Sequence, residues 1–187
     1  MAEDQPFGEI KETMRRVVTA LRDADVPFLL GGGLAVWAWG GPATGHDLDV
    51  MVLPEDAERA LEALGAAGMR TEKPPEGWLY KAWDGDVLVD IIFRPVGHEV
   101  DDEMFERADE LEVSAVPMKV MSLEDILVTK LLALDDHALD LERHLEFARS
   151  LRERIDWQDV RERTEHSPYA KAFFTLLEEL GIVERVT

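Results

Sequence analysis

Two carboxylates are spaced to share one face of a strand in the segment HDLDVMVL. Successive side chains of a strand point to opposite faces, so Asp47 and Asp49 lie on one face and Leu48 and Val50 on the other. Two negative charges about 4 Å apart repel each other by roughly 4 kcal/mol at an effective dielectric constant near 20. We therefore expect a cation between the two carboxylates, or protonation of one of them.

A third carboxylate stands in the apolar segment VLVDIIF. Asp90 has six apolar neighbours there, and a buried charge is rarely tolerated without a partner. Three carboxylates offer hard oxygen ligands that suit Mg²⁺ or Mn²⁺, whereas a zinc site usually includes His or Cys. We predict that Asp47, Asp49 and Asp90 are the catalytic and metal-binding residues. The alternative for the acid pair is an edge strand with one solvated face.

A run of three glycines, Gly31 to Gly33, precedes the acid pair. It follows an apolar segment and precedes a predicted helix, where missing side chains would let a phosphate approach backbone N–H groups. We predict that Gly32 and Gly33 bind nucleotide. The alternative is a tight turn without a ligand.

The elements that must position these residues change in type along the chain. Helical spacing predicts helices over 10–21, 34–39 and 55–67, and apolar runs predict strands over 28–30 and 47–53. Residues 78–83 and 87–93 flank a turn composition and predict a hairpin, followed by a strand near 111–116. From Ser122, which forms a capping box with Asp125, we expect helices only, the last over 169–180. The sequence thus predicts an α+β fold with an α/β core over 1–117 and a helical region over 118–187 packed on that core.

The composition limits the partners. The 187 residues carry a formal charge of −20 and no cysteine, and the N-terminus is acidic, unlike a signal peptide. No apolar run approaches the ~20 residues that span a bilayer. We expect a cytoplasmic protein that binds neither DNA nor a membrane, and whose charge favours a cationic or small acceptor over a polyanion.

The segment GGGLAVWAWGGPATGHDLDVMV resembles the signature of the nucleotidyltransferase superfamily, which has the polymerase beta-like fold, and VLVDIIF resembles its third-acid strand. The resemblance implies a mixed sheet flanked by helices, with a C-terminal helical bundle. It also implies transfer of a nucleoside monophosphate from a nucleoside triphosphate such as ATP to an acceptor hydroxyl, with Thr44 among the nucleotide-binding residues.

Within the superfamily the chain resembles both the AbiEii-like and the small aminoglycoside nucleotidyltransferases. The helical stretch LEDILVTKLLALDDHALDLERHLEFAR favours the AbiEii-like group, which implies that Lys130 contacts phosphate and Asp140 supports it. The acceptor would then be an RNA end or a protein hydroxyl, with an antitoxin as a partner protein. An RNA acceptor requires basic residues to gather on one face, the candidates being Lys119, Lys130, Arg143, Arg149 and Arg152. Alternatively, Lys130 is an exposed helix residue.

One departure from the superfamily pattern leaves two other functions open. Related sequences usually carry an Arg beside Thr44, whereas this chain reads Pro-Ala-Thr-Gly-His over 42–46, where His46 is a possible replacement. The aminoglycoside-type alternative is a transferase for a polycationic small molecule, which the acidic composition would attract. The other alternative is a degenerate domain that binds a nucleotide or a partner without catalysis.

Five aromatic residues flank the motifs and could stack on a base or line an acceptor pocket: Trp37, Trp39, Trp78, Tyr80 and Trp83. Aromatic residues at these spacings usually pack in cores or hairpins. We therefore expect at most two of them to contact a ligand.

Overall fold

The structure, a computed structural model, describes residues 5–42, 47–136 and 139–185. Within these ranges the strands form one seven-stranded sheet with the order β3-β4-β5-β2-β1-β7-β6. The strands are β1 Leu29–Leu30, β2 Asp47–Met51, β3 Arg70–Glu72, β4 Leu79–Asp84, β5 Val87–Ile92, β6 Asp109–Val113 and β7 Val116–Val120. The β2–β5 and β1–β7 pairs are parallel and the others antiparallel, so the sheet is mixed, as predicted.

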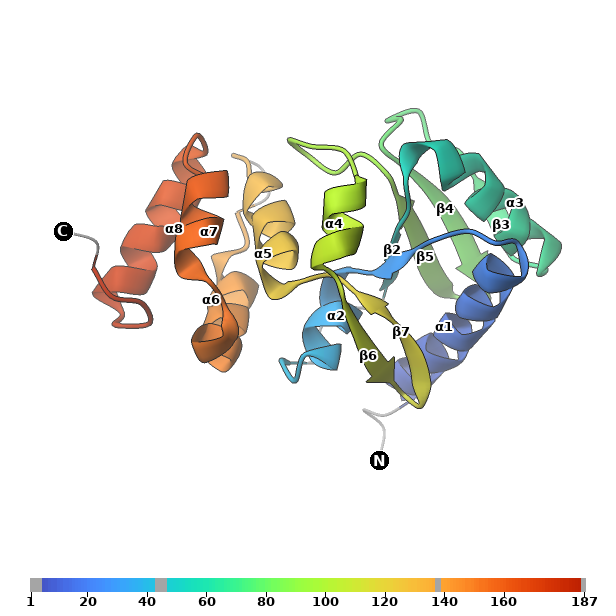
Figure 1. The fold of residues 1–187 in the computed structure, drawn as a ribbon, viewed down its shortest axis with the longest axis horizontal. Coiled ribbons are helices and arrows are strands. Elements are labelled where there is room, and N and C mark those ends of the chain that lie inside the picture. The colour runs from blue at the N-terminus through green and yellow to red at the C-terminus, as the bar shows by residue number, and fades with distance from the viewer. Residues whose placement is uncertain (1–4, 43–46, 137–138, 186–187) are drawn as a thin grey trace.

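Helices lie on the sheet and extend beyond it (Figure 1). They are α1 Gln5–Asp23, α2 Gly32–Ala38, α3 Ala57–Ala66, α4 Asp102–Arg107, α5 Leu123–Leu132, α6 Leu141–Leu151, α7 Trp157–Arg163 and α8 Pro168–Glu179. Helices α1 and α3 lie side by side against β2, β4 and β5, and α5 to α8 form a helical group at the other end of the molecule. This arrangement confirms the predicted α+β class. No helix within the described ranges is long and apolar enough to cross a membrane.

The two central strands separate an apolar face from an acidic one. Leu48 and Val50 of β2 and Val89 and Ile91 of β5 are buried on the face toward α1 and α3. Because side chains alternate along a strand, the opposite face of both strands carries the carboxylates. The predicted alternation therefore places the acid pair on the surface that α2 borders.

The structure differs from the sequence-based prediction near residue 114. One strand was expected over 111–116, but β6 and β7 form a hairpin there with the turn at Ser114 and Ala115. Both turn residues have positive φ, 50° and 64°, although neither is Gly, Asn or Asp. The turn therefore carries no compositional signal. Strand β3 and helix α4 were also not predicted.

The boundary predicted at residue 117 falls inside β7, so the sheet continues to Val120 and the helical group begins with α5. One continuous hydrophobic core runs from Ile10 of α1 to Leu177 of α8. We therefore propose a division of the chain at about residue 121, between two parts that share a core.

A buried ion cluster links the helical group to the sheet part. Asp125 of α5 is completely buried and accepts two hydrogen bonds from Arg107, both 3.0 Å long, and another from Arg163. Burial acts to raise the pKa of Asp125, but the hydrogen bonds from the two arginines outweigh it and hold the pKa below its usual value. Since the partners lie on α4 and α7, the cluster fixes α5 between these helices.

Candidate active site

Four residues form a row across the acidic face of the sheet. Asp49 of β2 and Asp90 of β5 are register partners, and adjacent strands lie about 4.8 Å apart. Lys81 of β4 is the register partner of Asp90 on its other side. Gly31, which donates its N–H to the carbonyl oxygen of Asp49 at 2.9 Å, completes the row. The predicted proximity of the second and third acids therefore rests on the β2–β5 register.

The glycine turn packs directly on Asp49. Gly32 has a φ of +58°, and a Cβ atom built on it would lie 1.7 Å from Oδ2 of Asp49. Only a residue without a side chain can bring the backbone that close, and only glycine adopts this φ without strain. The glycine run thus serves to bring α2 against the second carboxylate.

The surroundings of Asp49 favour a bound cation. Burial, and next the charge of Asp90, raise the pKa of Asp49 to about 6, whereas the charge of Lys130 lowers it. A hard divalent cation would offset the negative charge of this buried carboxylate, since Mg²⁺ is usually held by one or two carboxylates together with waters and substrate phosphates. Asp47, which lies on the same face, is the other carboxylate that could hold it.

Asp90 already has a partner in Lys81. Nζ of Lys81 donates to Oδ1 of Asp90 at 2.9 Å, and both side chains are largely buried. The sequence-based prediction gave Asp90 a metal ion as its partner and did not include Lys81. The hairpin predicts the contact, because Asp84 pairs with Val87 across the turn and counting three residues along each strand pairs Lys81 with Asp90.

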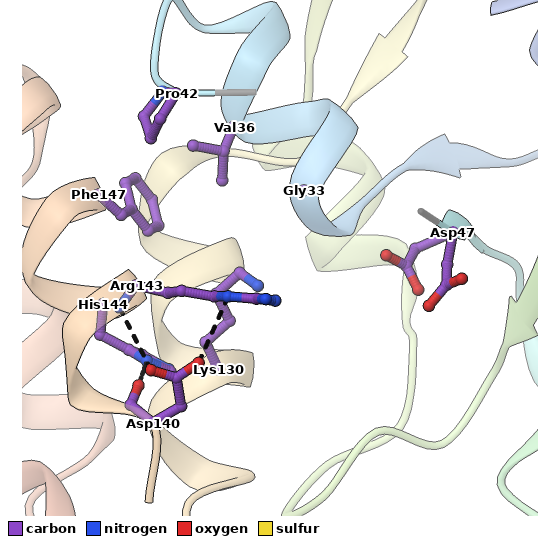
Figure 2. Close-up of a pocket in the computed structure, with 10 residues that line it drawn as sticks. Gly33, Val36, Pro42, Asp47, Lys130, Asp140, Arg143, His144 and Phe147 are labelled. Carbon is purple, nitrogen blue, oxygen red and sulfur yellow. Dashed lines mark hydrogen bonds and ion pairs between the residues drawn. The ribbon is translucent and has the colours of Figure 1, made fainter. Parts of the chain in front are cut away.

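A cleft of about 290 Å³ opens beside the acid pair, and we call it the polar cleft. Figure 2 shows Asp47 on one side and Lys130 and Arg143 on the opposite side, with Gly33 between them. Lys130 belongs to α5 and Arg143 to α6, so the helical group supplies the cationic wall. Opposed carboxylates and cations suit a ligand that carries phosphates and metal ions together.

The cationic wall is organised by the start of α6. Asp140 caps this helix, forms an ion pair with Arg143 over 3.4 Å, and accepts at its carbonyl oxygen from Nδ1 of His144. Burial lowers the pKa of His144 and also that of Lys130, although the charge of Asp49 raises the latter. Lys130 is therefore a largely desolvated ammonium group held near the acid pair, not the exposed residue of the alternative interpretation.

The structure brings several predicted residues to this cleft. Its lining includes Gly33, Asp47, Asp49, Lys130 and Asp140. The sequence did not predict that the start of α6 forms a wall of the site. Arg143, His144 and Phe147 follow Asp140 at helical spacing, and this spacing is the signal that places them on one face.

The remaining predicted residues stand elsewhere. Gly32 contacts Asp49 from the side of a second pocket, and Asp90 lies next to Asp49 but does not line the polar cleft. Thr44 and His46 lie outside the described residues. Within the described ranges, no three His, Asp or Glu residues are gathered closely enough to hold a metal ion by themselves. Metal binding by all three acids therefore stays a prediction.

The close contact at Gly32 gives a test of the geometry. We expect Gly32→Ala to lower the free energy of unfolding by about 1–3 kcal/mol more than Gly40→Ala, because the new Cβ must displace the Asp49 carboxylate. Gly40 is the matched control, since its φ is also positive, +91°, but an added Cβ meets nothing within 4 Å. Denaturant titration of both variants measures the difference. Equal destabilisation would mean that backbone strain alone, and not the contact with Asp49, requires glycine at position 32.

A family model described as an uncharacterised nucleotidyltransferase matches residues 9–179. The match spans both the sheet part and nearly all of the helical group, and so includes every residue that lines the polar cleft. No curated protein sequence matches the chain.

Solved structures of nucleotidyltransferases share the fold. The antibiotic-resistance factor ANT(2″)-Ia, solved with adenylyl-2″-tobramycin, superposes with a TM-score of 0.63 at 16% identity, covering 88% of this chain and 97% of its own. The lincosamide adenylyltransferase LnuA, solved with lincomycin, gives 0.53 at 14% identity, covering 82% and 97%. A Thermotoga maritima protein described as a nucleotidyltransferase gives 0.51 at 19% identity, covering 78% and 92%. At these identities the likeness establishes the fold.

Proposed function

The chain belongs to the nucleotidyltransferase family whose model spans residues 9–179, and from this premise we propose that it transfers a nucleoside monophosphate from a nucleoside triphosphate to a hydroxyl group of a small molecule. The polar cleft carries the proposal, because it sets Asp47 and Asp49 against Lys130 and Arg143. A triphosphate with its divalent cations has the anionic groups and the positive charge that match both walls at once.

In the proposed reaction the chain mainly provides position and charge. Lys130 and Arg143 bind the triphosphate, and Gly33, which lines the polar cleft without a side chain, leaves room for it beside Asp49. Asp47 and Asp49 would hold Mg²⁺ or Mn²⁺, and the bound ion would neutralise charge on the phosphates. Fixed charges of this kind act strongly in a site from which water is largely excluded.

The acceptor oxygen attacks the α-phosphorus, and the bond from that phosphorus to the oxygen bridging to the β-phosphate breaks. Pyrophosphate leaves with that bond's electron pair, and the hydroxyl proton passes to the carboxylate of Asp90. Lys81 donates to Oδ1 of this carboxylate and so orients Asp90 next to Asp49. A general base of this kind typically contributes about 10²–10⁴-fold to a rate.

A small-molecule acceptor agrees better with the basic residues than an RNA end does. Of the five candidates for an RNA-binding face, Lys130 and Arg143 line the polar cleft. Arg149 lies beside Glu142 and Glu146, and Arg152 pairs with Glu153. Two of the structural neighbours were solved with small molecules, adenylyl-2″-tobramycin and lincomycin, and this also supports a small-molecule acceptor. We therefore favour a small-molecule acceptor over the AbiEii-like toxin function and its antitoxin partner.

One observation favours the second candidate function, a domain that binds nucleotide without transferring it. Lys81 forms an ion pair with Asp90 over 2.9 Å, so the third carboxylate already has a partner other than a metal ion or an acceptor hydroxyl. Under that hypothesis the polar cleft binds a nucleoside triphosphate and Mg²⁺, but pyrophosphate is not released.

One experiment separates the two functions. The full chain is incubated with each of the four ribonucleoside triphosphates, labelled at the α-phosphate, with Mg²⁺ or Mn²⁺ and a mixed panel of small alcohols. We expect an acceptor-dependent release of pyrophosphate and a labelled product whose mass equals acceptor plus nucleoside monophosphate minus water. Triphosphate binding by calorimetry, with no product from any acceptor, would instead support the non-catalytic function.

A further inference from the structure

A second pocket, of about 200 Å³, adjoins the polar cleft, and we call it the apolar pocket. It shares Asp49 and Lys130 with the polar cleft. Its other walls come from the ends of β2 and β5, the loop after β5, and α5. Because no residue of α6 lines this pocket, a molecule bound here would reach Asp49 without contacting the part of the cationic wall that α6 supplies.

The lining of the apolar pocket is hydrophobic except at the shared edge. Met51, Ile92 and Ile126 line the pocket. Trp78 and Val96 also line it, and 39% and 56% of their surfaces are exposed. These are two of the four large hydrophobic residues that are exposed in the described part of the chain. Exposed apolar groups gathered at a concave site are typical of ligand-binding pockets.

Polar groups in the pocket are few. Asp49 and Lys130 are its charged residues, and both are shared with the polar cleft. Thr129 also lines the pocket, and its hydroxyl oxygen is buried without a hydrogen-bond partner in the structure. A polycation could pair with only one carboxylate in this pocket, that of Asp49. The polar edge of a nucleobase could form a hydrogen bond with only one side-chain hydroxyl, that of Thr129. Both ligands would leave buried polar groups unpaired, which costs about 1–3 kcal/mol for each group.

From this complementarity we propose that the apolar pocket binds the acceptor, and that the acceptor is a small alcohol with an apolar ring or chain and no multiple positive charge. That this alcohol is the acceptor of the transfer rests on the proposed function, whereas the binding of such an alcohol in the pocket does not. The pocket is smaller than the ~300–1,000 Å³ of sites that enclose a whole drug-sized ligand. It therefore holds the apolar portion, and the hydroxyl lies at the shared edge beside Asp49.

The test uses the full chain and 2-(2-naphthyl)ethanol as the probe, with binding measured by calorimetry. We expect Val96→Asp to weaken binding at least about tenfold, because the new carboxylate lies at an apolar wall. Leu180→Asp is the matched control, because Leu180 is also exposed, at 47%, but does not line the pocket. A saturating non-hydrolysable ATP analogue with Mg²⁺ is expected to leave probe binding within about twofold, because the triphosphate occupies the other cleft.

Three binding results would overturn the proposal: no probe binding at millimolar concentration, equal weakening in both variants, or displacement of the probe by the ATP analogue, which would assign the pocket to the nucleobase. Transfer to tobramycin that Val96→Asp leaves unchanged would also overturn it, while supporting nucleotide transfer itself. Conversely, Val96-dependent probe binding without transfer to any alcohol would support the pocket assignment and contradict the proposed function. The two proposals can therefore fail separately.

Discussion

Replacing Asp49 by Asn is expected to reduce nucleotide transfer at least about 10³-fold and, at neutral pH, to make the metal-free protein more stable. The first effect follows because the variant loses the carboxylate that β2, Gly32 and Lys130 surround. An amide has nearly the same shape, so it keeps the packing but not the charge that would hold the divalent cation. Single-turnover rates with saturating nucleotide and Mg²⁺ measure this loss.

The second effect follows from proton linkage. The pKa of Asp49 is about 6 in the folded protein instead of 3.8, so the folded state binds more protons between these values. Stability therefore falls as pH rises from about 4 to about 6 and stays lower above this range, by up to about 3 kcal/mol at 1.36 kcal/mol for each pKa unit. Asn carries no such charge, so the variant is expected to be more stable at pH 7.5 and to differ little from wild type at pH 4.

Asp109→Asn provides the control for this comparison. Asp109 is an exposed strand carboxylate on β6, at the far edge of the sheet from β5, and we expect its change to shift stability by less than about 0.5 kcal/mol. Denaturant titrations in EDTA at both pH values measure the difference. If Asp49→Asn were destabilising at pH 7.5, the carboxylate would have a favourable partner in the apo protein, and the argument for a cation there would fail.

The acid pair was predictable because it depends on local periodicity alone. Alternation in β2 fixes which face Asp47 and Asp49 share, whatever the sheet order is. The pairing of Asp90 with Lys81 was also within reach, since a short hairpin turn fixes the register by counting. Burial alone indicates that Asp90 needs a partner, but only the pairing with the neighbouring strand identifies that partner as Lys81 and not a metal ion.

The other wall of the site could not be predicted in the same way. Helical spacing places Asp140, Arg143 and Phe147 on one face of α6, but the same spacing fits a helix packed anywhere on the sheet. The position of the helical group depends on long-range contacts, such as the Asp125 cluster that fixes α5 between α4 and α7. The apolar pocket is likewise formed by residues from distant segments, such as Trp78, Val96 and Ile126, with no shared motif.

The second large effect is expected at Lys130, which lines both the polar cleft and the apolar pocket. Lys130→Met keeps the length of the side chain and removes its charge. We expect kcat/KM for the nucleoside triphosphate to fall about 10²–10³-fold, because a desolvated cation next to the phosphates interacts more strongly than an exposed one. The variant should remain folded, since burial already lowers the pKa of Lys130 and so disfavours its charged form.

Arg149→Met controls for the loss of a positive charge on the helical group, because Arg149 is exposed on α6 and lies outside the polar cleft. We expect less than about a twofold effect from it. A pH profile adds a readout that a structural defect would not produce. Since the charge of Lys130 lowers the pKa of Asp49, its removal raises that pKa further, and the acidic limb of residual activity in Lys130→Met should move to higher pH. An unchanged limb, or equal losses in the two variants, would show that Lys130 does not act on the acid pair or the nucleotide, because both expectations depend on its charge lying beside Asp49.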